Sequence, residues 1–462
     1  MRSYNRRQFI AATGALAALP GAAAFANQNS DVLSAQEAAV QLLPGGYGQT
    51  RLWGFNGGAP GPEIRLAQGS RLQRRLENQL PQPTSIHWHG IRIANAMDGV
   101  SGLTQSAVEA GSSFDYDFLV PDAGTYWYHA HNRSTEQVAR GLYGPLIVEE
   151  PDPLDIDRED VLVLDDWLVD PETGQLNSDF EAPHALSHAG RIGNFITTNG
   201  VSDLTLETRK NERLRLRLIN ASNARIFPLQ LQGLDGWTVA LDGMPLAIPQ
   251  KVTEPIVIAP AQRVDLIVDV VADAGQTAHV VQIGQQGAFS QVAFEVREGG
   301  AISRRSAPDA LPPNTSVPVN LASATAFTLQ MEGGAMGSLR SASLDGAEQT
   351  MNEIADAGRF WAFNGVADGI DGAPLARVGV GEHVRIAIRN DTAFPHAMHL
   401  HGMHFREISQ NGELGPLRDT TLLERGVNRE VAFVADNPGE WLLHCHMLSH
   451  AAAGMTTRIV VA

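Results

Sequence analysis

One segment of the chain occurs three times. Residues 69–90, GSRLQRRLENQLPQPTSIHWHG, and residues 381–402, GEHVRIAIRNDTAFPHAMHLHG, align without a gap, and residues 211–233 form a middle copy that needs one inserted residue. The outer copies end on histidine pairs, whereas the middle copy carries Gln230 and Gln232 there. Self-similarity of this kind is typical of repeated structural units. We therefore expect three copies of one domain, of which the first and third carry the chemistry.

Alternation of apolar and polar residues with period two runs through these copies, as in RLQRRLEN, LRLRLIN and VRIAIRN. This period predicts half-buried strands, and 45 glycines and 25 prolines supply frequent turns. Long amphipathic patterns that would indicate helices are hard to find. We expect an all-β chain built of β-sandwich or β-barrel domains.

Two polar, proline-containing segments divide the chain, EEPDPLDIDRED near 149–160 and SRRSAPDALPPNTSVP at 303–318. Such segments are typical of linkers. The intervening domains would hold about 120 to 160 residues, enough for a core of their own. The expected divisions are a leader at 1–26, domain one at 27–155, a middle spacer domain at 156–302, and a linker with domain three at 303–462.

The N-terminus has the features of a bacterial export signal. Arg6 and Arg7 precede an Ala/Gly-rich apolar run, and Ala24, Phe25 and Ala26 form a small-x-small cleavage site. That order is typical of a twin-arginine leader; the alternative is a disordered basic start before a core helix. We expect export to the periplasm or the medium. A single cysteine cannot form an internal disulfide in that oxidising compartment.

The chain is acidic, with 34 Lys and Arg against 51 Asp and Glu and a formal charge of −17. An acidic surface argues against nucleic acid and anionic membranes as partners. No stretch after the leader is long and apolar enough to span a bilayer. We expect a monomer that binds neither nucleic acid nor membrane.

Four histidine clusters lie in the outer copies: HWH at 87–89, HAH at 129–131, HAMHLH at 396–401 and HCH at 444–446. In a strand, residues i and i+2 point to the same face, so each H-x-H presents two imidazoles side by side. Imidazole suits copper, zinc, iron and nickel. Single histidines are usually structural, but four pairs in aligned repeats indicate metal binding. Structural zinc would want four ligands in one closed site, not eleven spread over two domains.

The only cysteine, Cys445, lies between His444 and His446. On a strand its thiol faces away from both imidazoles. A metal on the thiolate would thus be joined through about two residues of backbone to a metal on the flanking histidines. Thiolate with imidazole and a weak thioether suits copper in electron transfer. The first domain has no thiol at its equivalent position, Ala130, so one such mononuclear centre is expected.

From about Gly45 to the C-terminus, these motifs resemble the three-domain multicopper oxidases. The resemblance implies three consecutive cupredoxin domains with a copper-free middle domain. It also implies four coppers, one of type 1 in the third domain and a trinuclear cluster between the first and third. The ligands carried over are, for type 1, His396, Cys445, His450 and axial Met455; for type 2, His87 and His399; and for type 3, His89, His129 and His446 on one copper and His131, His401 and His444 on the other.

The resemblance also assigns a catalytic acid, because O₂ reduction consumes protons. Asp98 is placed like an acid that family members keep beside the type 2 copper; a turn residue before Gly99 is the alternative reading. His184 and His188 could share a helical face and bind an extra metal, although an ordinary surface turn explains them as well. The remaining histidines are given structural roles: His279, His383 and His404.

The leading interpretation of function is a laccase-like oxidase that takes electrons from phenols and aromatic amines and reduces O₂ to water. It assumes an exposed type 1 edge at His450 or His396, bordered by Phe394. The first alternative is a periplasmic oxidase of Cu⁺ or another metal ion, and the second a non-enzymatic cupredoxin-fold protein. Relatives that oxidise Cu⁺ carry a methionine-rich insertion, of which QMEGGAMGS at 330–338 would be a thin remnant. Ala451 stands where some relatives carry a proton-passing glutamate.

Overall fold

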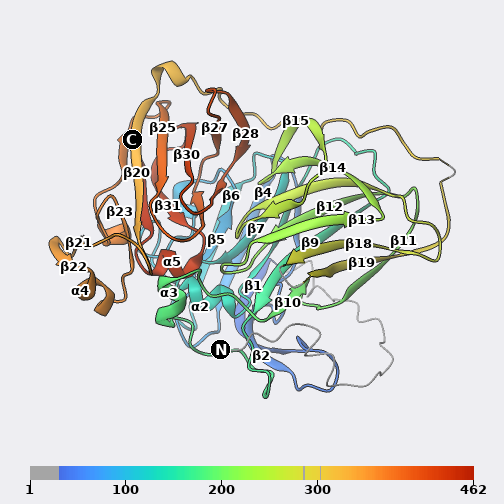
Figure 1. Ribbon diagram of the computed structural model, residues 1–462, viewed down its shortest axis with the longest axis horizontal. Helices are drawn as coiled ribbons and strands as arrows, with labels where there is room; N and C mark the ends of the chain where they lie inside the picture. The colour runs from blue at the N-terminus through green and yellow to red at the C-terminus, as the bar shows by residue number, and fades with distance from the viewer. Residues whose placement is uncertain (1–30, 285–286, 302) are drawn as a thin grey trace.

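The computed structural model describes residues 31–284, 287–301 and 303–462, and the expected leader lies outside these ranges. Six sheets of four to six strands account for most of the fold (Figure 1), two in each third of the chain. The prediction of an all-β chain is confirmed. Within the described ranges, no helix has both the length and the apolar character needed to span a membrane.

The first unit consists of two four-stranded sheets, in the orders β2-β1-β4-β6 and β3-β8-β7-β5. Its strand β4 carries the repeated segment, and its strands β5 and β7 carry the first two histidine clusters. Its elements are β1 (Val32–Val40), β2 (Thr50–Phe55), β3 (Ile64–Ala67), β4 (Arg71–Asn78), β5 (Ile86–His89), η1 (Asn95–Met97), β6 (Ser113–Leu119), β7 (Gly124–Ala130), α2 (Ser134–Ala139) and β8 (Tyr143–Glu149).

The second unit pairs a six-stranded sheet, β10-β9-β12-β17-β14-β15, with a five-stranded one, β11-β19-β18-β13-β16. Its elements are β9 (Arg158–Trp167), α3 (Pro183–Ser187), β10 (Phe195–Thr198), β11 (Leu204–Lys210), β12 (Arg213–Asn220), β13 (Phe227–Gln232), β14 (Leu234–Leu241), β15 (Met244–Lys251), β16 (Ile256–Ile258), β17 (Arg263–Val270), β18 (Thr277–Gly284) and β19 (Gly287–Gly300).

The third unit has the sheets β23-β20-β25-β30-β27-β28 and β24-β32-β31-β26-β29, with a separate hairpin β21-β22. Its elements are η2 (Leu321–Ser323), β20 (Thr325–Gly333), β21 (Ser341–Leu344), β22 (Ala347–Thr350), α4 (Met351–Asp356), β23 (Trp361–Phe363), η3 (Gly369–Asp371), β24 (Ala376–Val378), β25 (His383–Asn390), β26 (His396–Leu400), β27 (Phe405–Ile408), β28 (Leu414–Arg418), β29 (Thr420–Leu423), β30 (Asn428–Val434), β31 (Gly439–Cys445), α5 (Leu448–Ala452) and β32 (Thr456–Val461).

The three units share one strand topology. In each unit one sheet contains a parallel pair that includes the repeated strand, namely β1 with β4, β9 with β12 and β20 with β25. The other sheet contains a second parallel pair, β3 with β8, β11 with β19 and β24 with β32. The remaining pairings are mostly antiparallel, as β-sandwiches usually are. The repeat seen in the sequence is therefore a repeat of structure.

A repeated asparagine explains why the segment is kept in all three copies. Asn78, Asn220 and Asn390 end strands β4, β12 and β25, and each is buried. Each side-chain amide donates to two backbone carbonyls, and each side-chain oxygen accepts the N–H two residues on. Buried main-chain groups need such partners. In the outer units this bonding fixes the loop that leads into the histidine strands β5 and β26.

The outer units share a hydrophobic core. One cluster of buried residues contains Trp88 and Tyr128 of the first unit together with Trp441 and Cys445 of the third. The middle unit has a cluster of its own around β12 and β17. This continuous core holds the first and third units in a fixed position relative to one another, because close-packed interiors have few voids and are hardly compressible. The histidine strands lie within this shared region.

Candidate metal centres

Strand register places the four histidine clusters in matching positions. His87 of β5 is opposite His129 of β7, and His399 of β26 is opposite His444 of β31. The second member of each H-x-H pair lies on the same strand face as the first. Each outer unit thus presents four imidazoles from two adjacent strands and the residues that directly follow them.

The eight imidazoles meet between the first and third units. Nε2 of His401 lies 3.2 Å from Nε2 of His444, and Nε2 of His129 lies 3.4 Å from Nε2 of His446. The ligand atoms of His131, His401 and His444 fall within 4.8 Å of one another, as do those of His87, His399 and His401. Seven of the eight side chains are buried and His131 is half-buried. The predicted type 2 and type 3 ligands therefore form one cluster.

The predicted type 2 pair shows how the cluster fits a metal. Nδ1 of His87 donates to the carbonyl of Asp98 at 2.8 Å, and Nδ1 of His399 donates to the carbonyl of Asp419 at 2.9 Å. Each Nε2 then carries a lone pair, and neither has a hydrogen-bond partner among the described residues. A buried polar atom without a partner costs about 1–3 kcal/mol. A shared metal ion would satisfy both atoms.

Burial sets the protonation of these rings. Desolvation, followed by the repulsion of neighbouring histidines, holds the pKa values of His129, His401 and His444 well below the ordinary value of 6.5. The rings are neutral at pH 7, which is the form that binds metal.

A second, smaller cluster lies in the third unit. Nδ1 of His396 and Nδ1 of His450 are 3.1 Å apart and lie 3.5 and 3.7 Å from Sγ of Cys445. Burial raises the pKa of the thiol to about 12, so a bound cation is needed to stabilise the thiolate. Met455 is buried beside the cluster, and its carbonyl accepts the N–H of Cys445 at 3.1 Å. These are the donors of an electron-transfer copper site.

The outer nitrogens of this cluster are held by protein. Nε2 of His450 donates to the carbonyl of His188 at 2.6 Å, and Nε2 of His396 contacts Oγ1 of Thr392 at 2.7 Å. The Thr392 hydroxyl already donates to Asn390, so it accepts from His396. Both Nδ1 atoms therefore carry lone pairs directed at the cluster, a preformed metal site.

The expectation of an exposed type 1 edge is wrong. His396 and His450 are both 0% exposed. The cause is helix α3 of the middle unit, which packs against α5 (Figure 1). Its C-terminal neighbour His188 places its carbonyl on Nε2 of His450. Trp361 completes the cover, with its ring centroid 4.5 Å from that of His450 and its Nε1 donating to the carbonyl of Leu186.

Comparisons with known proteins agree with this arrangement. Profiles described as multicopper oxidase match residues 37–153, 158–297 and 345–462. A multicopper oxidase from Mycobacterium tuberculosis is 30% identical over 433 residues, covering 87% of this chain and 81% of the relative. The chain belongs to the multicopper oxidase family. Members of the family are copper oxidoreductases that use O₂, and the three consecutive cupredoxin domains implied by the resemblance are confirmed.

Other relatives of this multicopper oxidase differ in their named roles. Copper resistance protein A of Pseudomonas syringae pv. tomato is 28% identical, covering 88% of this chain and 89% of the relative. Laccase-1 of Botryotinia fuckeliana is also 28% identical, covering 88% and 78%. Among solved structures, Lac15 from a marine microbial metagenome is 42% identical with a TM-score of 0.75, covering 93% and 99%. A multi-copper oxidase from Pseudomonas thermotolerans is 33% identical with a TM-score of 0.81, covering 93% and 98%.

Asp98, predicted as a catalytic acid, lies against the larger cluster of this multicopper oxidase. It is fully buried, and its Oδ2 is 3.0 Å from Nδ1 of His401. Its Oδ1 lies 3.2 Å from Nδ1 of His87, although the Asp98 carbonyl is the better aligned acceptor for that ring. The carboxylate thus contacts ligands predicted for two different coppers.

A second buried carboxylate, Asp419, was not predicted. Its Oδ1 is 3.3 Å from Nε2 of His89, which leaves Nδ1 of that ring without a hydrogen-bond partner among the described residues. Arg263 donates to both carboxylate oxygens, at 2.9 and 2.6 Å. Burial opposes ionisation of Asp419, but Arg263 and the neighbouring histidines outweigh it and hold its pKa well below the ordinary value.

The middle unit of this multicopper oxidase is more than a spacer. The candidate groups of metal ligands found among the described residues all consist of residues of the first and third units. Yet Arg263 supports the larger cluster through Asp419, and His188 covers the smaller one. Both contacts join parts of the chain that are distant in sequence, so the histidine pattern gave no sign of them.

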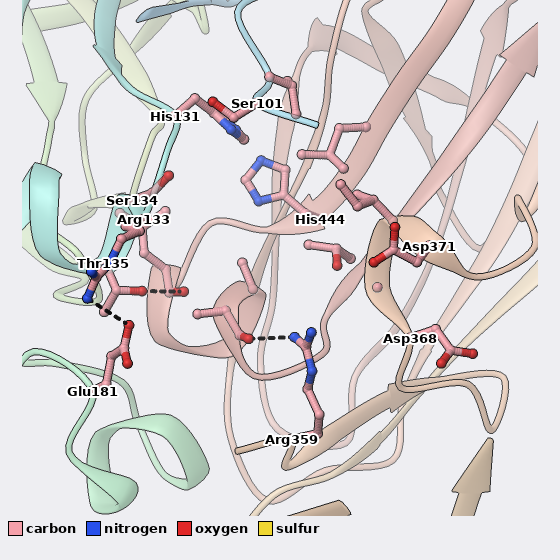
Figure 2. Close-up of a pocket in the computed structure, with 18 residues that line it drawn as sticks. Ser101, His131, Arg133, Ser134, Thr135, Glu181, Arg359, Asp368, Asp371 and His444 are labelled. Carbon is pink, nitrogen blue, oxygen red and sulfur yellow. Dashed lines mark hydrogen bonds and ion pairs between the residues drawn. The ribbon is translucent and has the colours of Figure 1, made fainter. Parts of the chain in front are cut away.

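A pocket of about 230 Å³ opens beside the larger cluster. Figure 2 shows His131 and His444 on one side of it and the carboxylates of Asp368 and Asp371 on another. Arg133 and Ser134 of the first unit, Glu181 of the second and α5 of the third complete its walls. Small molecules can therefore approach two predicted type 3 ligands from the surface.

The remaining histidines are distributed over the molecule. His279 contacts the Ser290 hydroxyl, and His383 accepts the N–H of Asn320, as expected for structural residues. His404 lies 3.8 Å from Asp419 at the edge of the larger cluster. His184, the second residue of α3, and His188, which directly follows it, lie one helical turn apart, with ring centroids 4.0 Å apart and planes 10° from parallel.

Proposed function

We propose that this multicopper oxidase is laccase-like: it removes single electrons from phenols and aromatic amines and uses four of them to reduce O₂ to two waters. The proposal includes four coppers, held by the ligand sets carried over from the family. Bound copper supplies the one-electron chemistry, because it alternates between the +1 and +2 states.

One observation carries the proposal. Cys445 belongs to the smaller cluster, while the residues on either side, His444 and His446, belong to the larger one. The two clusters are therefore joined by continuous backbone within a shared, buried core. A protein that only stored or buffered metal would not need this link between a thiolate site and an eight-imidazole site.

The pocket beside His131 and His444 is the route that we assign to O₂ and product water. It reaches two of the imidazoles of the larger cluster, His131 and His444, and its lining does not include His188, which covers His450. Asp98 would supply protons at the buried end of this region, where its carboxylate contacts His401. We also propose that the protein acts after export, as a monomer in the periplasm or the medium.

A second candidate substrate is Cu⁺, because relatives include copper resistance proteins as well as a laccase. Burial of the predicted type 1 ligands does not discriminate between phenols and Cu⁺, because either donor has to pass its electron through the cover over His450. Met336 in the segment 330–338 is 79% exposed, and the preceding residue, Ala335, donates its N–H to the carbonyl of Ser187 in α3. The methionine segment thus lies against the cover.

Steady-state kinetics of copper-loaded protein tests the proposal. We expect oxidation of a methoxyphenol and an aromatic diamine without added Cu²⁺, with one O₂ consumed for every four electrons. Cys445→Ser should abolish both the intense blue band and the turnover while the fold persists, as judged by circular dichroism. Oxidation of phenols that appeared only with excess Cu²⁺, alongside efficient turnover of Cu⁺, would favour the metal-ion oxidase instead.

A further inference from the structure

Residues 177–191 of the middle unit form a closed loop that carries helix α3 at its tip. Arg191 ties the two ends of this loop together, because its guanidinium donates to the carbonyls of Asn177 and Asp179 at 2.7 and 2.8 Å. Burial lowers the pKa of Arg191 to about 10, so the guanidinium is still a cation at pH 7. Compact loops whose ends are joined hold their own shape. The position of α3 is therefore set by where the ends of the loop are held.

A series of cation–π contacts holds the ends of the loop against the first unit. The Phe180 ring packs against Arg191 of the same loop and Arg140 of the first unit, with each guanidinium carbon 4.5 Å from the ring centroid. Arg140 also lies over the Trp53 ring, at 4.3 Å. Phe180 and Trp53 are both buried, and contacts of this kind are strongest where water is excluded. The series thus joins the loop to the end of α2.

The tip of the loop presents three successive carbonyl groups to the third unit. They belong to Leu186, Ser187 and His188, at the end of α3, where helical carbonyls have no partner within the helix. Their donors are Nε1 of Trp361 at 2.6 Å, the N–H of Ala335 at 2.7 Å and Nε2 of His450 at 2.6 Å, respectively. The position of the loop therefore decides whether a predicted type 1 ligand keeps its outer hydrogen bond.

The hydrogen bond from His450 affects how strongly this ring donates electrons to a metal. A backbone carbonyl that accepts the outer N–H of a histidine ligand raises the basicity of the ring and tunes the metal. A more basic ring stabilises Cu²⁺ more than Cu⁺, because the ion of higher charge gains more from the added electron density. Such a ligand lowers the reduction potential of the copper that it holds.

We propose that the 177–191 loop lowers the reduction potential of the type 1 copper through the bond between His188 and His450. Arg140, Phe180 and Arg191 act as positioning residues, because they hold the loop that places the His188 carbonyl. The middle domain thereby restricts the enzyme to donors of low potential. This inference rests on the type 1 ligand set of the proposed function and adds an origin for the potential of that site.

Redox titration of the blue band in the copper-loaded protein measures this potential. Arg191→Met keeps the length of the side chain but removes both hydrogen bonds that close the loop. We expect binding of Cu²⁺ to weaken relative to Cu⁺ by about tenfold, the lower end of the cost of losing a partner of a ligand. For one electron, this change raises the potential by about 59 mV. Arg191→Lys, which keeps the charge and can still reach one carbonyl, should give a smaller rise.

Phe180→Leu tests the cation–π series separately, because it keeps an apolar side chain and removes only the ring. It should raise the potential in the same direction as Arg191→Met. The matched control is Arg158→Met: Arg158 also donates to a backbone carbonyl of the middle unit, that of Glu207 at 2.8 Å, but has no described contact with the loop. The control should leave the potential unchanged even where it lowers the temperature of thermal unfolding.

The outcomes separate this inference from the proposed function. A wild-type potential in Arg191→Met and Phe180→Leu, or an equal rise in Arg158→Met, would overturn the role of the loop. If Arg191→Met does not fold, a wild-type potential in Phe180→Leu alone overturns it. Absence of a blue band in the copper-loaded wild type would instead refute the type 1 assignment itself.

Discussion

Replacing Arg263 with methionine tests how the middle domain supports the larger histidine cluster. Both Arg263 and Asp419 are at most 1% exposed, and two hydrogen bonds of 2.9 and 2.6 Å join them. Methionine keeps most of the volume of the side chain but leaves the Asp419 carboxylate buried without its countercharge. Breaking a buried ion pair from one side typically costs about 3–5 kcal/mol. We expect a loss of that size in the free energy of unfolding.

The same change should act on the cluster selectively. Asp419 contacts His89 and His399, whereas the smaller cluster around Cys445 has no contact with it among the interactions described. An uncompensated Asp419 favours uptake of a proton, which would remove its hold on Nε2 of His89. We expect Arg263→Met to lower the rate of O₂ reduction and the copper content of the larger cluster while the blue band remains.

Thermal unfolding, copper analysis and the visible spectrum measure these effects together. The control is Arg297→Met, because Arg297 pairs with Glu207 at 2.8 Å with 52% and 70% of the side chains exposed. Such exposed pairs contribute at most about 1 kcal/mol. Adding Asp419→Asn to Arg263→Met should recover part of the lost stability, since it removes the unpaired charge. Equal destabilisation by Arg263→Met and Arg297→Met, or no recovery in the double variant, would refute the reasoning.

Four further predictions follow from the site and its supports. His87→Ala should leave the blue band but stop O₂ reduction, because His87 is in the larger cluster only; bleaching of the band would contradict its assignment. Asp98→Asn should slow reoxidation of the reduced enzyme by O₂ in stopped flow, with reduction by a phenol unaffected. Ser134→Phe, which narrows the pocket, should raise the KM for O₂ severalfold without changing the KM for a phenol. Burial would raise the pKa of Asp265, but Arg215 and Arg217 outweigh it and lower that pKa. The Asp265 carboxylate therefore stabilises the fold above its unfolded pKa of about 4, and this stabilisation is lost as the pH falls through the folded pKa. In urea titrations, the difference in stability between wild type and Asp265→Asn should narrow below about pH 4.

The two histidine clusters could be predicted from sequence because strand geometry is local. Once two segments are known to be strands, H-x-H pairs must share a face, and the gapless alignment of repeats places His87 with His399. The register of β5 with β7 and of β26 with β31 follows the same rule in both outer domains. The lone Cys445 facing the opposite side is a consequence of the same period.

The supports of the clusters could not be located in this way because they depend on contacts between domains. Nothing in RVDLIVDV indicates that Arg263 reaches Asp419, 156 residues further along the chain. One signal was available nearby. The arginines of RLRLRLIN and the aspartates of RVDLIVDV alternate in phase, as charged pairs across neighbouring strands do, and the structure joins Arg213 to Asp269 and Arg215 to Asp265. A pairing of β12 with β17 was therefore predictable, although its extension to the metal cluster was not.

The middle domain shows what a repeat can contribute without the histidine pair of the other two copies. Its glutamines, Gln230 and Gln232, replace the histidine pair, and its α3 segment and Arg263 instead reach one cluster each. Since α3 and Trp361 cover His450, a reductant has to give its electron through this cover and not directly to the edge of a predicted ligand. Donor preference should therefore respond to substitutions in 182–190 more than to substitutions in the outer domains. Under the proposed function, the α3 segment that buries the smaller cluster would also be the surface on which phenols and Cu⁺ compete.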